Sequence, residues 1–282
     1  MRVIAPGKLV LTGAYAVLEG APAIVAAVDR YAIADERAPA DVDVRALHDD
    51  EGRKLGLGSS AASLVASLGA RAVARGDDPR SARVRTEIFR GARTAHARQQ
   101  GGGSGVDIAA SVFGGVLRYA VGPNVPVIRP VELPPQVVLV AYWSGTSART
   151  SDLRARVDAL KASGSQTVFA RLRDLAEDSA AAVDAGEAGA FVRLARAYGV
   201  ALDLLGQAAD APIVLPAFAE LASVAEGESA AFLPSGAGGG DVAVWLGTAP
   251  PSAAFDRRAE ALALQPLTIS IDQGGVRPES LS

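Results

Sequence analysis

The chain has 282 residues, of which 49% are hydrophobic, 5% aromatic and 21% charged, and its formal net charge is −3. This length predicts one large domain or two modest ones, and the slightly acidic balance excludes the basic surface that nucleic-acid binding needs. With no cysteine and two histidines, disulfides, thiolate metal sites and a multi-histidine zinc site are excluded. A bound metal should be a hard cation on oxygen ligands, such as Mg²⁺.

The N-terminal residues contain no apolar block of the signal-peptide kind, and no run approaches the roughly 18 apolar residues of a membrane span. We therefore expect a cytoplasmic protein without a membrane partner. Whether the chain is a monomer or a homodimer is left open by the sequence.

The first half of the chain alternates apolar, β-rich runs with helical patterns. Residues 36–55 are polar, with Val42 and Val44 indicating a small strand. Ser59 is the expected N-cap of the first helix. Strands are predicted at 2–5 and 9–12 (broken at Pro6-Gly7), 23–35, 115–120 and 125–131, and helices at 59–75, 81–99 and 106–113.

Pro134-Pro135 is the predicted boundary between an N-terminal lobe, residues 1–134, and a C-terminal lobe, residues 135–282. The order of elements after it predicts a split βαβ-type α+β lobe. The tail from Gln273 contains Gly-Gly and Pro and is expected to fray. Strands are predicted at 137–143, 230–233, 242–246 and 267–271, and helices at 151–162, 166–185, 189–208, 214–225 and 251–263.

A first glycine loop, G-L-G-S-S-A at 56–61, leads into a predicted helix. Backbone N–H groups at a helix start attract anions, and glycines let a phosphate approach the backbone. The alternatives are a plain turn that caps a helix and a dinucleotide fingerprint, but the latter needs a preceding buried strand, which residues 48–54 do not form. No Walker A pattern occurs. A polyphosphate cradle is therefore predicted at Gly56, Leu57, Gly58, Ser59, Ser60 and Ala61.

Three further features carry chemistry. Asp107 follows a second glycine loop, 101–105, and a carboxylate at a helix start stays ionised and suits proton transfer or alignment of a substrate hydroxyl. A third loop, 235–241, holds more glycines than a turn requires. Lys8 follows Pro6-Gly7 in a predicted hairpin and is a candidate anion contact. Taken singly, each also fits a structural explanation: a helix-cap Asp, a plain β-connection and a solvated edge lysine.

The order of these motifs resembles that of the GHMP small-molecule kinase family. The motifs are A-P-G-K-L-V-L-T-G-A-Y-A-V-L-E-G at 5–20, G-L-G-S-S-A-A at 56–62, G-S-G-V-D at 103–107 and S-G-A-G-G-G-D at 235–241. Within the family, the chain looks most like phosphomevalonate kinases, since mevalonate kinases usually carry G-E-H-A-V where Ala14 and Tyr15 stand here. The resemblance implies a two-lobed α+β fold, with an N-terminal lobe like domain 2 of ribosomal protein S5 and a ferredoxin-like C-terminal lobe.

The resemblance also implies roles for individual residues. ATP phosphates would lie on the first loop, with Ser60 contacting Mg²⁺ and the phosphates. Asp107 looks like the carboxylate that faces the acceptor, and Lys8 like its basic partner. Acceptor contacts are expected from the second and third loops, and from the stretch after the strand at 137–143, where an ordinary helix cap is the alternative. These contacts are Lys8, Ser104, Gly105, Ser147, Arg149, Thr150, Ser151, Gly238 and Gly239.

Three departures from the family pattern concern the ligands. The segment 36–55 is shorter than usual, which bears on the adenine pocket. The stretch before G-S-G lacks a basic residue, and Leu233 replaces a common lysine. We expect an ATP- and Mg²⁺-dependent kinase acting on phosphomevalonate or a related anionic alcohol. The alternatives are a mevalonate kinase, a decarboxylase like that acting on diphosphomevalonate, and a catalytically silent ligand-binding protein of the same fold.

Overall fold

The computed structural model describes residues 1–100, 102–147 and 150–280. The first half contains β1 (Arg2–Thr12), η1 (Ala16–Glu19), β2 (Ala23–Asp35), β3 (Ala38–Asp43), η2 (Arg45–Leu47), α1 (Ser59–Ala74), α2 (Ala82–Gln100), α3 (Val106–Phe113), β4 (Val116–Ala120) and β5 (Val127–Val131). The second half contains β6 (Val138–Trp143), α4 (Thr150–Ala162), α5 (Thr167–Asp184), α6 (Ala188–Ala208), α7 (Pro216–Gly227), β7 (Ala231–Pro234), β8 (Val242–Gly247), α8 (Ala253–Ala261), β9 (Gln265–Leu267) and β10 (Arg277–Pro278).

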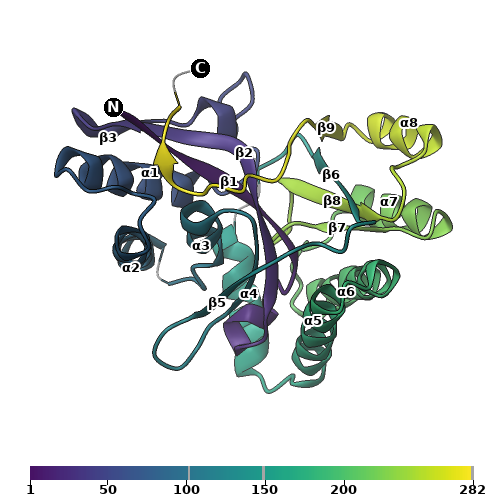
Figure 1. Ribbon diagram of the computed structural model, residues 1–282. Helices are drawn as coiled ribbons and strands as arrows, with labels where there is room; N and C mark the ends of the chain where they lie inside the picture. The colour runs from purple at the N-terminus through teal and green to yellow at the C-terminus, as the bar shows by residue number, and fades with distance from the viewer. Residues whose placement is uncertain (101, 148–149, 281–282) are drawn as a thin grey trace.

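Two separate sheets organise these elements into a two-lobed α+β fold, as predicted (Figure 1). The six-stranded sheet has the order β10-β1-β2-β4-β5, with β3 paired to β2, and the four-stranded sheet has the order β7-β8-β6-β9. Helices α1, α2 and α3 lie with the first sheet and α6, α7 and α8 with the second, while α5 packs against α6 and also contacts η1 and β2. The division at residue 134 stays a prediction, because β10 returns from the C-terminal end of the chain to pair with β1.

The N-terminal strand is continuous, so the prediction of two strands broken at Pro6-Gly7 is wrong. Pro6 pairs with Tyr31 and Gly7 with Val28, so two extra residues of β2 absorb the irregularity as a bulge. Proline has no N–H to donate to the ladder, and the bulge on the partner strand lets pairing resume at Gly7. Lys8 follows directly, on a strand held along its length by β2.

Helix α1 begins at Ser59, and its N-cap lies one residue before the predicted one. Gly58 is the N-cap, with φ 79° and ψ 35°, and Ser59 is the first helical residue. This left-handed conformation is accessible to glycine at little cost, which explains why Gly58 rather than Ser59 occupies the cap.

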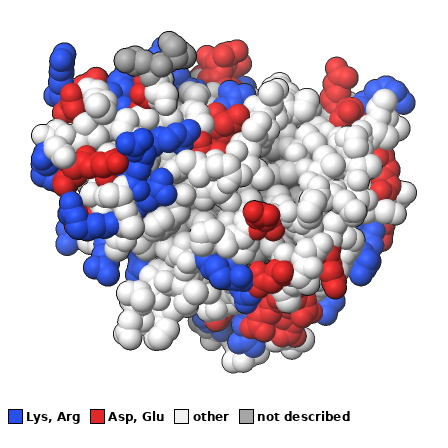
Figure 2. Space-filling view, viewed as in Figure 1, with Lys and Arg blue, Asp and Glu red and all other residues white. Residues whose placement is uncertain are grey.

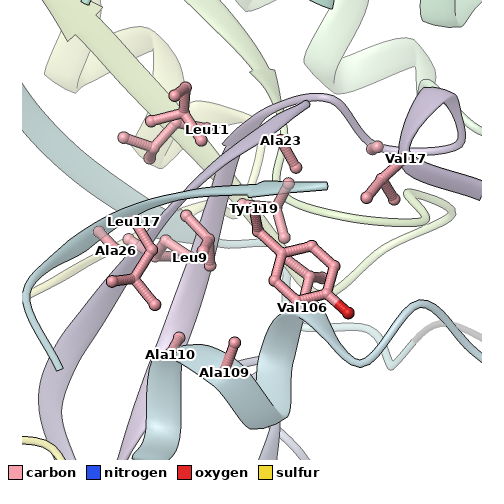
Figure 3. Packing of buried hydrophobic residues seen from close by; sticks show 14 of the residues in the cluster. Leu9, Leu11, Val17, Ala23, Ala26, Val106, Ala109, Ala110, Leu117 and Tyr119 are labelled. Atoms are coloured by element: carbon pink, nitrogen blue, oxygen red, sulfur yellow. The ribbon is translucent and has the colours of Figure 1, made fainter. Parts of the chain in front are cut away.

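Small buried residues let the helices pack close to the first sheet. A Cβ added at Gly69 of α1 would lie 2.8 Å from side-chain atoms of both Val3 and Val276. Figure 3 shows Ala109 and Ala110 of α3 facing the strands that carry Leu9 and Leu117. This packing fixes α3, and with it the position of Asp107 in the first turn of the helix.

The C-terminal tail is anchored, so the expectation that it frays from Gln273 is wrong. The Asp272 carboxylate accepts hydrogen bonds from Arg277 at 2.7 and 3.0 Å and from the Tyr31 hydroxyl at 2.8 Å. Val276 is fully buried. Burial alone would raise the pKa of Asp272, but the hydrogen bonds from Arg277 and Tyr31 outweigh it and hold the pKa below its usual range. The tail thus forms part of the first sheet and its core.

We expect Asp272→Ala to lower the free energy of unfolding by about 2–3 kcal/mol, because it leaves Arg277 and Tyr31 without their shared partner. Because folding lowers the pKa of Asp272, its contribution is present above about pH 4 and is lost as the pH falls through the folded pKa. Urea unfolding at pH 7 and pH 3 measures both effects, with Asp41→Ala on the exposed side of β3 as control. An Asp272→Ala protein as stable as the control at pH 7 would contradict this account.

Candidate functional site

Lys8 is the point where the predicted motifs meet. Its Nζ donates a hydrogen bond to the carbonyl of Gly56 at 3.1 Å, and its backbone N–H donates to the carbonyl of Leu57 at 2.9 Å. Desolvation lowers the pKa of Lys8, while the charges of Asp107 and Asp241 oppose that shift. The structure therefore brings Lys8 together with the first glycine loop and with two carboxylates.

Asp107 lies in the first turn of α3, as predicted, with Gly105 as the left-handed N-cap. One carboxylate oxygen accepts the N–H of Ile108 at 3.0 Å, and the other lies 3.9 Å from Nε2 of the buried His96. These contacts hold the carboxylate at the start of α3. Sequence reasoning did not select His96, although it stands in the helix that leads into the second loop.

The second glycine loop is attached to the sheet beneath it. The hydroxyl of Tyr119 on β4 donates to the carbonyl of Ser104. The Ser104 side chain accepts from the N–H of Val106 at 3.4 Å. Gly101 lies outside the described residues. These contacts fix the peptide that precedes Asp107, whereas the predicted acceptor contacts of Ser104 and Gly105 stay predictions.

The first glycine loop is shaped by close contacts that only glycine permits. Gly56 and Gly58 both have φ 79°. A Cβ added at Gly56 would lie 2.2 Å from Cβ of Asp241, and one at Gly58 would lie 3.1 Å from Cγ of Lys8. The side chains of Leu57 and Ala61 are buried in the core, and Ser59 is 8% exposed. Ser60 is the half-buried hydroxyl at this helix start, so backbone N–H groups and Ser60 are what this loop offers a phosphate.

The third glycine loop is joined to β1 and to the turn that follows it. The buried Ser235 hydroxyl accepts the N–H of Val10 at 2.9 Å, and the Tyr15 hydroxyl donates to the carbonyl of Ala237 at 2.7 Å. A Cβ added at Gly236 would lie 3.7 Å from Nζ of Lys8. Gly236 is thus the glycine of this loop that neighbours Lys8.

The predicted acceptor contacts Gly238 and Gly239 meet other parts of the second lobe. A Cβ added at Gly238 would lie 2.1 Å from the carbonyl oxygen of Ile213, and one at Gly239 would lie 2.6 Å from Cδ1 of Leu153. Both glycines therefore let the loop lie tightly against its own lobe. Their contact with an acceptor stays a prediction.

Tyr15 has a strained backbone. Its φ of 63° and ψ of −50°, with a 2.8 Å hydrogen bond from the N–H of Ala16 to the carbonyl of Ala14, form a γ-turn. Such a conformation costs about 1–3 kcal/mol and persists where surrounding contacts enforce it. Here Tyr198 donates to the Ala14 carbonyl at 2.6 Å, and Tyr15 itself reaches Ala237. The strained turn thus supports the third loop.

The predicted acceptor segment after β6 is joined to the third loop through its first residues. The N–H of Asp241 donates to the Thr146 carbonyl at 2.7 Å, and the N–H of Ser144 donates to the Asp241 carbonyl at 2.9 Å. Ser147, Thr150 and Ser151 are exposed, and Arg149 lies outside the described residues. The segment is therefore tied to the third loop, and the predicted acceptor contacts of Ser147, Thr150 and Ser151 stay predictions.

Arg154 brings positive charge to the second glycine loop from α4. A Cβ added at Gly102 would lie 3.3 Å from Nη2 of Arg154. The guanidinium also lies 3.6 Å from the carboxylate of Asp158, one turn further along the helix. The sequence lacks a basic residue just before G-S-G, and Arg154 supplies one from another part of the chain. No local pattern identified Arg154 as a site residue.

Charge elsewhere is mixed. In Figure 2, arginines over the side of α1 and α2 are interspersed with acidic groups, and the middle of this face carries little charge.

Within the described residues, no group of three or more His, Cys, Asp and Glu side chains is arranged to hold a metal ion. Among the helices of the described ranges, none is both long and apolar enough to cross a bilayer.

The comparison with curated protein sequences found two relatives, and both are kinases. The chain is 30% identical to the phosphomevalonate kinase of Streptomyces sp. (strain CL190) over 226 residues, which are 71% of this chain and 59% of that protein. It is 34% identical to the mevalonate kinase of Aeropyrum pernix over 143 residues, 48% of this chain and 41% of that protein. The chain thus spans less than two thirds of either curated relative. No family model matches the sequence.

Solved structures share the fold over nearly the whole chain. The Lin0012 protein of Listeria innocua aligns with a TM-score of 0.85 at 23% identity, covering 98% of both chains. Phosphomevalonate kinase of Streptococcus pneumoniae, in complex with phosphomevalonate and AMPPNP, aligns with a TM-score of 0.80 at 17% identity, covering 96% of this chain and 99% of that one. In fold and in sequence, this chain resembles the GHMP small-molecule kinases, and within that family it is similar to phosphomevalonate kinase.

Proposed function

We propose that this protein transfers the γ-phosphoryl group of ATP to a small anionic acceptor, with (R)-5-phosphomevalonate, converted to 5-diphosphomevalonate, as the first candidate. The observation that carries the proposal is the position of Lys8, with its Nζ on the phosphate loop at Gly56 and the charge of Asp107 beside it. Phosphoryl transfer depends mainly on alignment and on stabilising charge on the transferred group. A half-buried ammonium group at a phosphate loop serves both needs.

The residues divide the work between donor and acceptor. The backbone of Gly56–Ser60 would hold the donor phosphates, with Ser60 near Mg²⁺, which when bound neutralises phosphate charge. In the reaction, the bond between the γ-phosphorus and the ADP oxygen breaks while a bond to the acceptor oxygen forms. Lys8 stabilises the transferred group. Asp107 orients the acceptor and, where the acceptor is a hydroxyl, takes its proton.

Arg154 favours a phosphorylated acceptor over an uncharged one. Its guanidinium adjoins Gly102, a few residues before Asp107, and a guanidinium is well matched to phosphate oxygens. The sequence similarity to phosphomevalonate kinase supports the same choice, while the shorter match to mevalonate kinase keeps mevalonate as the alternative. The protein would then act in the mevalonate pathway of isoprenoid biosynthesis, in the cytoplasm.

The acceptor is identified by measuring ADP release from pure protein with ATP and Mg²⁺ in the presence of phosphomevalonate, mevalonate, diphosphomevalonate, galactose or homoserine. We expect the highest kcat/KM with phosphomevalonate. Release of carbon dioxide from diphosphomevalonate would instead identify a decarboxylase. ATP binding without ADP release for any acceptor would support the silent ligand-binding alternative.

With a hydroxyl acceptor such as mevalonate, Asp107→Asn should lower kcat by about 10²- to 10⁴-fold, because the amide cannot take the proton. With phosphomevalonate, whose acceptor oxygen is already ionised, the loss of the negative charge beside Lys8 should lower kcat by a smaller factor. Titration calorimetry with AMPPNP should show nucleotide binding retained, since Asp107 lies outside the phosphate loop. Asp174→Asn, which changes an exposed acid on α5, is the control. Turnover unchanged in Asp107→Asn would contradict the proposed chemistry.

Arg154→Gln should raise KM for phosphomevalonate by about 10-fold, the loss of one charge-assisted hydrogen bond of about 1.5 kcal/mol, while KM for ATP stays unchanged. Arg156→Gln on the same helix is the matched control, because Arg156 pairs with Asp210 instead. A fall in kcat with an unaltered acceptor KM would show that Arg154 does not bind the acceptor.

A further inference from the structure

Asp241, the last residue of the third glycine loop, lies where three segments of the site come together. Its N–H donates to Thr146 and its carbonyl accepts from Ser144, so its backbone is joined to the acceptor segment on both sides. Its side chain points the other way, onto the first glycine loop. There the Gly56 Cβ position would be 2.2 Å from Cβ, 2.7 Å from Cγ and 3.2 Å from Oδ2 of Asp241.

The same glycine, Gly56, also accepts a hydrogen bond from the ammonium group of Lys8. Nζ donates to the Gly56 carbonyl at 3.1 Å, and the Cβ position of Gly236, five residues before Asp241, is 3.7 Å from Nζ. The ammonium group and the carboxylate therefore lie on one peptide of the phosphate loop. The negative charge of Asp241 acts on Lys8 from this position and opposes the lowering of its pKa by desolvation.

The backbone of Asp241 is adapted to this position. Its φ of 56° lies in the left-handed region, which a non-glycine residue enters at some cost, and Asp and Asn more readily than others. A carboxylate held in an unfavourable backbone conformation, against a glycine whose missing Cβ makes room for it, indicates a constraint on the side chain itself.

We propose that Asp241 is a positioning residue of the phosphoryl-transfer centre, whose carboxylate on Gly56 keeps the Lys8 side chain in its ammonium form and holds it at the phosphate loop. The role in catalysis rests on the proposed kinase function, whereas the effect on Lys8 does not. Within residues 1–100, 102–147 and 150–280, the charged groups that face Lys8 are Asp107 from α3 and Asp241 from the third loop. Behind Asp107 lie His96 and Arg93 on α2 and Tyr119 on β4.

Asp107 and Asp241 thus act on Lys8 in the same direction, because both carboxylates favour its ammonium form. Desolvation favours neutral Lys8, and each carboxylate favours the protonated form. Removing the charge of Asp241 should therefore let Lys8 lose its proton at lower pH. Since the ammonium form is the one that stabilises a transferring phosphoryl group, activity would fall earlier as the pH rises.

The chain offers a clean direct test because Lys8, Lys54 and Lys161 are its three lysines. Protein labelled with ¹³C at lysine Cε gives three NMR signals, which K54R and K161R variants assign. We expect the Lys8 signal of ligand-free Asp241→Asn to titrate about 1 pH unit below that of the wild type. Asp174→Asn, which removes an exposed charge from α5, should leave the Lys8 titration unchanged, and Asp241→Glu should largely preserve it.

Asn tolerates the left-handed backbone, and circular dichroism checks that the variant folds. If it does not, Asp241→Gly, which removes both the charge and the backbone strain, takes its place. A Lys8 titration that is the same in the charge-free variant and in the wild type overturns the proposal.

The pH dependence of kcat/KM provides the second readout, in which the alkaline limb of Asp241→Asn should move down by the same interval as the NMR titration. The two measurements separate this inference from the proposed function. A shifted Lys8 titration in a protein that releases no ADP with any acceptor would uphold the effect of Asp241 on Lys8 and refute the kinase function, and with it the catalytic role of Asp241. If the protein is an active kinase, but Asp241→Asn changes neither the alkaline limb nor the Lys8 titration, the kinase function stands and the proposal for Asp241 is overturned.

Discussion

The site is organised by the need to keep one ammonium group, that of Lys8, charged while protein surrounds it. Removing a charge from water is costly unless opposite charge and hydrogen bonds replace the solvent. Here a loop carbonyl accepts from Nζ, and Asp107 and Asp241 supply the negative charge. The glycines follow from the same requirement, because the Cβ positions of Gly58 and Gly236 adjoin the Lys8 side chain, and that of Gly56 is taken by Asp241.

Strand β1 also determines how the third glycine loop, in the second half of the chain, is positioned next to the ammonium group of Lys8. Lys8 of this strand donates to the first glycine loop, and the N–H of Val10 donates to Ser235. The turn that follows the strand carries Tyr15, whose hydroxyl donates to Ala237. A rigid strand paired to β2 along its length transmits position better than a loop would. The strain at Tyr15 becomes intelligible on this basis, since the turn must end the strand and still bring a hydroxyl to the other lobe.

The sequence allowed us to predict those features that residues close together in the chain determine. The helix and strand patterns, the glycine loops and the order of the motifs led to the two-lobed fold and to Lys8. The errors arose where a distant partner decides: β2 absorbs the irregularity at Pro6, and Tyr31 helps to hold Asp272 and hence the tail. Asp241 was visible as the end of a motif, but its meaning depends on Gly56, which lies far away in the chain and is brought close only by the fold.

The missing basic residues near the second and third loops have a similar explanation. A cation for an acceptor can come from any element that reaches the site, and Arg154 reaches Gly102 from a helix in the other half of the chain. A phosphate acceptor is already ionised near neutral pH, so it needs cations to bind it more than a base to activate it. Two carboxylates around Lys8 suit that chemistry, because their first task is to keep the lysine charged. On the proposed function, Asp107 would act as a base only for a hydroxyl acceptor, and the positions of Lys8 and Arg154, rather than the glycine motifs, would determine which acceptor the protein uses.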